Sequence, residues 1–180
     1  TQWQLSHVDM HVPLVLNPQS SGVIGQLYMP QDYKHILEAC IPIVKVGQQT
    51  PNFRGPLVAS NDRAIGQMAG NYLMSLGLEH FAFCSSGRWP FAEDRLEGFM
   101  QALCREHPGP VENHFGTDHT LSQSLDFEQQ ITQWIKNLPK PCGIFCSNDA
   151  TGIDVIRIAR MAGIHIPGDL AVLGVDDDEI

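Results

Sequence analysis

Short apolar runs rich in β-branched residues alternate along this chain with longer segments in which apolar residues recur at helical spacing. This alternation is typical of an open α/β sheet with largely parallel strands, because each strand is followed by a helix that crosses back over the sheet. The pattern predicts strands at residues 4–8, 22–28, 43–46, 57–59, 80–84, 143–146 and 171–175. It predicts helices at residues 32–39, 65–76, 92–107, 127–138 and 150–162.

Two segments break the alternation. The polar tripeptide Ser85-Ser86-Gly87 follows a predicted strand, and residues 108–124 form an irregular stretch around a short strand expected near residues 111–115. A chain of 180 residues can form one domain or two small lobes. We expect the tripeptide to mark a crossing between lobes, so that residues 1–85 form part of an N-terminal lobe and residues 86–180 form a C-terminal lobe.

The composition is that of a globular protein, with 43% hydrophobic and 17% charged residues. The formal net charge is −9, from 11 Lys and Arg against 20 Asp and Glu. Phosphate binding requires clustered basic side chains, so this balance argues against a nucleic-acid surface within the chain. If the whole protein binds DNA, another segment must do so.

No apolar run approaches the length that crosses a bilayer, and residues 1–4 have neither the basic start nor the apolar centre of a signal peptide. We therefore expect a cytoplasmic protein that makes no membrane contact, although the chain starts without an initiator methionine. Five cysteines, an odd number scattered through apolar stretches, argue against a disulfide framework. Cys142 and Cys146 lack the spacing of a zinc knuckle, and neither a metal nor a cofactor is predicted.

Polar and aromatic side chains follow three predicted strands at the points where those strands end. In an open parallel sheet these ends meet at one edge, where loops and helix N-termini bind ligands. The candidate ligand-binding residues are Arg88, Trp89, Arg95, Asn148, Asp149 and Asp176. This set suits a neutral sugar, because carboxylates accept its hydroxyl protons, Arg and Asn donate to its oxygens, and an indole stacks on its apolar C–H face.

Each of these residues also has a purely structural interpretation. Asn148 or Asp149 could serve only as the N-cap of the following helix, a role that both residue types favour. Residues 176–179 could form a solvated acidic turn. Trp89 could pack in the core or at a hinge, and Arg95 could lie on a helix surface. Their expected position at one sheet edge favours the ligand-binding interpretation.

Catalytic chemistry has less support in the sequence. Ser85-Ser86-Gly87 lacks the Gly-x-Ser-x-Gly frame of a nucleophile elbow, and no phosphate-cradling loop ends in Lys-Ser/Thr. His7 and His11 flank Asp9, but on a predicted strand and its exit loop the two imidazoles need not share a face. We therefore expect neither an enzyme nor a metal site.

Three segments, which follow one another along the chain in the family's order, resemble the effector domains of the lac repressor family. Residues 163–177, Gly-Ile-His-Ile-Pro-Gly-Asp-Leu-Ala-Val-Leu-Gly-Val-Asp-Asp, are similar to the family's helix end, Pro-x-Asp, strand and Gly-x-Asp-Asp signature. Residues 95–99 resemble its Arg-Leu-x-Gly-Phe, and residues 143–149 resemble its strand ending in Asn-Asp. Weaker matches extend the resemblance over roughly residues 22–179. Within the family, the Arg-Trp before the helix and the acidic run look most like the xylose operon regulator branch.

The resemblance implies a two-lobed periplasmic-binding-protein-like fold, with parallel sheets flanked by helices, of which this chain is an incomplete fragment. In that family a sugar closes the cleft between the lobes and repositions DNA-binding parts. Arg95, Asn148 and Asp176 match the effector-contacting Arg, Asn and Asp of the family, whereas Asp149, Arg88 and Trp89 come from the sheet-edge reasoning alone. The order Ser60-Asn61-Asp62 departs from the family's usual Ser-Asp-Asn, so no contact is assigned to that helix start.

The expected function is sugar sensing by a bacterial transcription regulator, with a pentose such as xylose favoured. The expected partners are a small sugar, DNA through a domain absent from this chain, and a second copy in a homodimer. Two alternatives stay open: a periplasmic sugar-binding protein of a transporter, and a carbohydrate-processing enzyme that uses the carboxylates of residues 176–179.

Overall fold

The computed structural model describes residues 21–26, 34, 38, 40–48, 53–104, 109–116 and 125–179. The chain divides into two compact units, Thr1–Ser60 and Asn61–Ile180. This boundary lies before the one expected near residue 85, and the tripeptide Ser85-Ser86-Gly87 lies inside the second unit. The correspondence between these units and the two lobes of the family fold stays a prediction.

The first unit contains a parallel sheet of three strands in the order β1-β2-β3. These strands are β1 (Val23–Gln26), β2 (Ile43–Val46) and β3 (Leu57–Val58). All three lie within strands that the sequence pattern predicts. The strand expected at residues 4–8, with His7 and its neighbours, lies outside the described residues, as does most of the helix expected at residues 32–39.

The second unit contains a parallel sheet of four strands in the order β5-β4-β6-β7. Its strands are β4 (His80–Ser85), β5 (Glu112–Phe115), β6 (Cys142–Cys146) and β7 (Leu170–Leu173). Its helices are α2 (Asp62–Ser75), α3 (Pro90–Leu103), α4 (Leu125–Asn137) and α5 (Asp149–Met161). Each corresponds to a predicted element, which confirms the α/β class.

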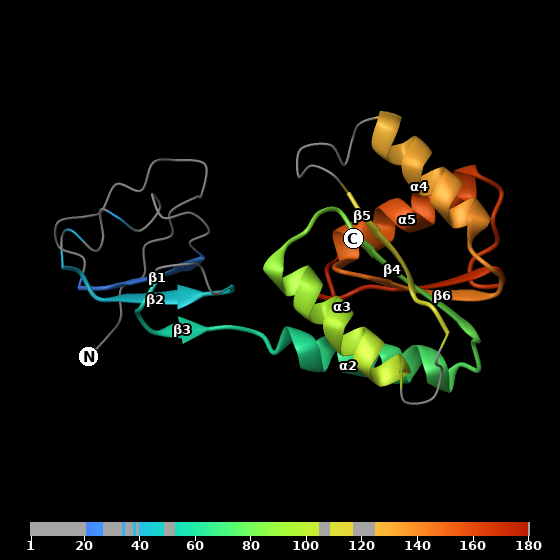
Figure 1. The fold of residues 1–180 in the computed structure, drawn as a ribbon. Coiled ribbons are helices and arrows are strands. Elements are labelled where there is room, and N and C mark those ends of the chain that lie inside the picture. Colours follow the sequence, from blue (N-terminus) through green and yellow to red (C-terminus); the bar gives the residue numbers. More distant parts are fainter. Residues whose placement is uncertain are drawn as a thin grey trace. The chain divides into compact units, whose positions relative to one another are not determined.

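Helices cover both faces of the four-stranded sheet, with α2 and α3 on one face and α4 and α5 on the other (Figure 1). Side chains of a strand alternate between these faces. Phe81 and Phe83 of β4 therefore pack against α2 and α3, whereas Ala82 and Cys84 pack against α4 and α5. The continuous apolar run of β4 reflects this burial on both faces.

Helices α2 and α3 approach each other closely enough for their backbones to touch. A Cβ atom on Gly66 would lie 2.0 Å from the carbonyl oxygen of Arg95, and one on Gly98 would lie 2.0 Å from the carbonyl oxygen of Arg63. Glycine is therefore required at both positions because any side chain would collide with the opposite backbone. This contact holds the start of α2 beside the second turn of α3.

Several element ends differ from the sequence prediction for local reasons. Helix α2 begins at Asp62 because the side chain of Asn61 accepts a hydrogen bond from the backbone N–H of Ala64, at 3.1 Å. Helix α3 begins at Pro90, whose fixed φ suits the first helical position.

Among the described residues, no helix combines the length and apolar character needed to cross a bilayer.

Candidate functional site

The carboxyl ends of β4, β6 and β7 lie at one edge of the second sheet, because these strands are parallel neighbours. Hydrogen bonds tie the segments after them together. The backbone N–H of Ser147 donates to the carbonyl of Cys84 at 2.8 Å, and the backbone N–H of Asp149 donates to the carbonyl of Val175 at 2.9 Å. The edge is therefore a connected structure rather than three independent loops.

Arg95 is buried at this edge, with a relative exposure of 7%. Its Nε donates to Oδ1 of Asp62 at 2.9 Å, and its Nη1 donates to the backbone carbonyl oxygen of Ser147. Its guanidinium carbon lies 5.0 Å from the ring centroid of Phe91, one helical turn earlier on α3. These contacts exclude the interpretation of Arg95 as a surface residue of the helix.

Asn148 is the N-cap of α5, as its structural interpretation predicts. Its Oδ1 accepts hydrogen bonds from the backbone N–H of Thr151 at 2.9 Å and from the Thr151 hydroxyl at 2.7 Å. The cap uses only the side-chain oxygen, so the amide nitrogen of Asn148 can donate to a ligand at the sheet edge. Capping and ligand binding are compatible roles for this residue.

Asp149 holds the chain that leaves β7 against the start of α5. Its Oδ2 accepts a hydrogen bond from the backbone N–H of Asp178 at 3.0 Å. A Cβ atom on Gly174 would lie 2.0 Å from Oδ1 of Asp149, so a side chain at this position would displace that carboxylate. β7 ends at Leu173, before the predicted end at residue 175, where the chain turns along Asp149. Asp149 thus has a clear structural role at the site.

Asp176 is exposed and lies in the left-handed region of backbone conformation, with a φ of 121°. Partial burial of its carboxyl group raises its pKa above the ordinary value of 3.8, and the guanidinium of Arg95 opposes this shift. The neighbouring carboxylates of Asp149, Asp178 and Asp62 raise the pKa of Asp176 further. The guanidinium of Arg95 thus lies close enough to Asp176 to influence the charge of its carboxyl group.

The other two candidates lie where β4 leads into α3. Arg88 is exposed, and its guanidinium contacts Oε1 of Glu93 at 3.4 Å and the ring of Phe115 at 4.5 Å. Trp89 is half-buried and stacks on Phe91, with ring centroids 6.4 Å apart. Phe91 thus contacts both Trp89 and the guanidinium of Arg95. The contacts of Arg88 with Glu93 and Phe115 do not bring it into this cluster.

Three contributors were missing from the sequence prediction: Asp62, Phe91 and Ser147. The acidic start of α2 was the available signal for Asp62, and an aromatic residue four positions before an arginine on one helix was the signal for Phe91. Ser147 is fully buried, and its hydroxyl has no hydrogen-bond partner among the described residues.

Among the residues that the structure describes, no group of three or more His, Cys, Asp or Glu residues is placed to hold a metal ion.

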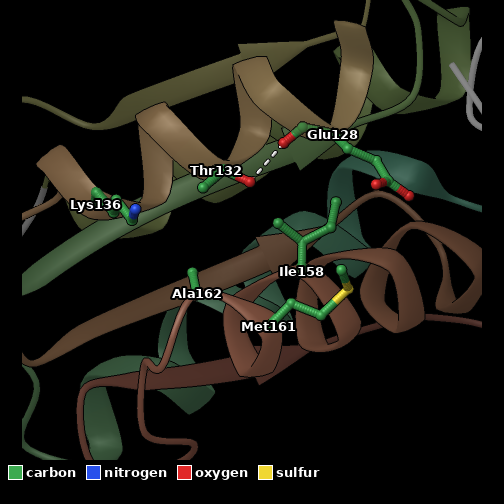
Figure 2. Close-up of a pocket in the computed structure, with 6 residues that line it drawn as sticks. All are labelled: Glu128, Thr132, Lys136, Ile158, Met161 and Ala162. Atoms are coloured by element: carbon green, nitrogen blue, oxygen red, sulfur yellow. Dashed lines mark hydrogen bonds between the residues drawn. The ribbon is translucent and has the colours of Figure 1, made fainter. Parts of the chain in front are cut away.

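A groove of about 230 Å³ lies between α4 and α5, away from this edge. Figure 2 shows its lining residues: Glu128, Thr132, Lys136, Ile158, Met161 and Ala162. The α5 residues among them belong to its C-terminal end and C-cap, whereas the candidate site lies at its N-terminus. The groove therefore does not correspond to the site at the carboxyl ends of the strands.

Relatives of this chain include sugar-operon regulators. It is 24% identical over 181 residues to the xylose operon regulatory protein of Haemophilus influenzae, covering 94% of this chain and 46% of that protein. It is 31% identical over 149 residues to the ribose operon repressor of Halalkalibacterium halodurans, covering 80% of this chain and 42% of that protein. The chain thus spans less than half the length of these two relatives.

The fold is also similar to that of the xylose-binding transcription activator xylR, with a TM-score of 0.75 and 23% sequence identity. This alignment covers 89% of the present chain and 44% of the xylR chain. Residues 71–180 match the family described as periplasmic binding protein-like domain. The match covers more than half of the chain and confirms the fold that the sequence resemblance implied. The chain belongs to the periplasmic binding protein-like domain family.

Proposed function

We propose that this chain is the effector-sensing part of a sugar-responsive bacterial transcription regulator. The observation that carries the proposal is the buried guanidinium of Arg95, held at the carboxyl edge of the sheet in a cluster with the Asp176 carboxylate. Arg95 and the amide of Asn148 donate to sugar oxygens, and Asp176 accepts from a sugar hydroxyl. The names of the relatives support a sugar effector, and we propose more specifically that this sugar is a pentose such as xylose.

The mechanism is binding and switching without turnover. A sugar that contacts both lobes stabilises the closed state by the difference in its affinity for the closed and open states. The full-length protein acts as a homodimer in the cytoplasm. A DNA-binding domain elsewhere in it responds to the shift from the open to the closed state. By linkage, operator DNA changes sugar affinity by the same factor as sugar changes operator affinity.

The transporter alternative has less support, because the relatives described above are regulators of transcription or operon expression. The enzyme alternative loses support for the same reason. A sugar that is recovered chemically unchanged after incubation with the protein would agree with sensing rather than catalysis.

The test is calorimetry on the full-length protein with D-xylose, D-ribose and other neutral pentoses and hexoses. Asp176→Asn removes the acceptor charge and retains a residue that tolerates positive φ. We expect it to weaken binding of the preferred sugar about 10- to 100-fold, the effect of losing a hydrogen bond to a charged group. Asp177→Asn makes the same charge change at the adjacent positive-φ residue and is the matched control, expected to bind nearly normally.

Arg95→Ala is a less direct test, because it leaves the largely buried Asp62 carboxylate, which is 13% exposed, without its cation. Breaking a buried ion pair in this way typically costs about 3–5 kcal/mol of stability. We therefore expect Arg95→Ala to lose sugar binding and to lower the unfolding temperature. Equal sugar affinity of Asp176→Asn and the wild type would refute the site assignment, and absence of binding to every sugar would refute the proposed function.

A further inference from the structure

An ion pair at the sheet edge joins the first residue of α2 to the second turn of α3. Oδ1 of Asp62 lies 2.9 Å from Nε of Arg95, and the two side chains are 13% and 8% exposed. Asn61 caps α2 with its own side chain, and the carboxylate of Asp62 reaches across to α3. The order of these two residues, reversed from the family's usual one, thus gives them separate roles.

The neighbouring residue shows that this pair is not an ordinary surface contact between the helices. Arg63 pairs with Asp94 at 3.0 Å and with Glu97 at 2.7 Å, and all three side chains are about half exposed. Exposed pairs of this kind contribute little because water screens them. Asp62 and Arg95 are instead largely removed from water, so the position and charge of one depend strongly on the other.

The contacts of Arg95 fix the plane of its guanidinium group. Asp62 binds Nε, the carbonyl of Ser147 binds Nη1, and the ring of Phe91 lies against the guanidinium. These hydrogen bonds use one N–H of Nε and one of Nη1, so within the described residues the N–H groups of Nη2 and the second N–H of Nη1 can serve a ligand. A guanidinium held in this way loses little conformational entropy when a sugar binds.

The same pair determines the charge that the site presents. Asp62 neutralises Arg95 at 2.9 Å, and Oδ2 of Asp149 accepts a hydrogen bond from the backbone N–H of Asp178 at 3.0 Å, which holds the acidic turn beside this pair. The carboxylates of Asp149, Asp178 and Asp62 also raise the pKa of Asp176. The cluster therefore carries more negative than positive charge. A sugar acid or sugar phosphate would be repelled, whereas an uncharged sugar can hydrogen-bond to both signs of charge.

We propose that Asp62 is a positioning and specificity-determining residue of the sugar site: it orients the guanidinium of Arg95 and makes the site select uncharged sugars over sugar acids. This inference rests on the proposed function. It assigns to the start of α2 a part in ligand recognition that acts through Arg95. A purely structural role for the ion pair would alter stability without changing the preference between ligands.

The experiment measures binding of D-xylose and D-xylonate to the full-length protein by calorimetry at low ionic strength and pH 7. These ligands share a five-carbon skeleton, but xylonate carries a carboxylate at C1 and is open-chain, whereas xylose forms a ring. The change in relative affinity between variants, in which this difference in ring form cancels, therefore reports on charge. The wild type is expected to prefer D-xylose. Asp62→Asn should weaken D-xylose binding about tenfold, because a charge-assisted hydrogen bond that orients Arg95 is lost. The ratio of D-xylose affinity to D-xylonate affinity should fall by a similar factor, because one charge that repels xylonate is lost.

Two further variants separate positioning from stability. Asp94→Asn makes the same substitution in the exposed ion pair between the same helices and should leave both affinities unchanged. Asp62→Glu retains the charge but displaces the carboxylate, so it should lower D-xylose affinity while keeping the wild-type ligand ratio. If Asp62→Asn does not fold, the D-xylose affinity of Asp62→Glu still tests whether Asp62 positions Arg95.

The outcomes distinguish this inference from the function on which it rests. If the wild type binds neither D-xylose nor any other neutral sugar, the proposed function is wrong. If the wild type prefers D-xylose and Asp62→Asn keeps both its affinity and its ligand ratio, the role of Asp62 is wrong and the function stands. An unchanged D-xylose affinity in Asp62→Glu would overturn the positioning role in the same way.

Discussion

Replacing Gly98 with alanine would place a methyl group against the backbone of α2. The new Cβ would lie 2.0 Å from the carbonyl oxygen of Arg63, 2.8 Å from its carbonyl carbon and 2.9 Å from its Cα. Ordinary van der Waals contact begins near 3.4 Å. Backbone atoms cannot rotate away as a side chain can, so α3 would have to recede from α2 by more than about 1 Å.

The expected cost follows from two opposing contributions. Overpacking of this kind typically costs about 1–3 kcal/mol, and a collision with backbone belongs at the upper end or beyond. Alanine regains about 1 kcal/mol because it favours the helix more than glycine does. We expect Gly98→Ala to lower the free energy of unfolding by about 2 kcal/mol.

The assay is urea denaturation of the full-length protein, followed by tryptophan fluorescence, in which Trp89 and Trp134 report on the second unit. Gly152→Ala is the matched control, because this glycine is also helical and buried, yet its new Cβ would lie 3.8 Å from the nearest atom, Cβ of Cys146. We expect the control to be as stable as the wild type or up to about 1 kcal/mol more stable. Similar effects of the two substitutions would show that α2 and α3 are not in backbone contact.

Three further predictions concern the cap, the acidic turn and the thiols. Asn148→Ala should lower the free energy of unfolding by about 1 kcal/mol through loss of the α5 cap, whereas Asn148→Asp should retain it, because a carboxylate accepts the same hydrogen bonds; thermal unfolding distinguishes them. The raised pKa of Asp176 means that the folded state binds its proton more tightly than the unfolded state, so its contribution to stability is present at low pH and lost as pH rises through the folded pKa. Asp176→Asn should therefore be more stable than wild type at pH 7, with a difference that disappears below the ordinary pKa of 3.8; a difference that grows on acidification would contradict the sign. Burial raises the pKa of Cys84 and Cys142 to about 12 and that of Cys146 well above its usual range, so a thiol reagent should modify these three only after denaturation. The exposed thiols should react at once in the native protein; they are Cys40 and Cys104.

The strands and helices of the second unit could be predicted because burial on both faces of a parallel sheet produces continuous apolar runs with helical segments between them. β2 has the same bounds in the structure as in the prediction, residues 43–46. Element ends were less accurate where a tertiary contact decides them. β7 stops early because the chain after it is drawn against Asp149, a contact between residues far apart in sequence.

The site was predictable as a set of residue types at one sheet edge, but not as a set of contacts. Asn148 has the cap geometry that its residue type favours. The ion pair between Asp62 and Arg95 depends on the distance between α2 and α3, which two glycines set by permitting backbone contact. Neither hydrophobic period nor spacing along the chain encodes that distance.

The capping role of Asn148, together with the ligand contact proposed for it, would limit how ligand preference can change during evolution. A substitution at Asn148 would change the helix cap as well as the proposed ligand contact, so a variant with a new ligand preference would also have to tolerate a less stable helix. Asp176 is exposed, and its side chain caps none of the helices whose caps the structure describes. Divergence toward new effectors is therefore expected to accumulate first in the acidic turn, while the capping position stays nearly constant among functional descendants.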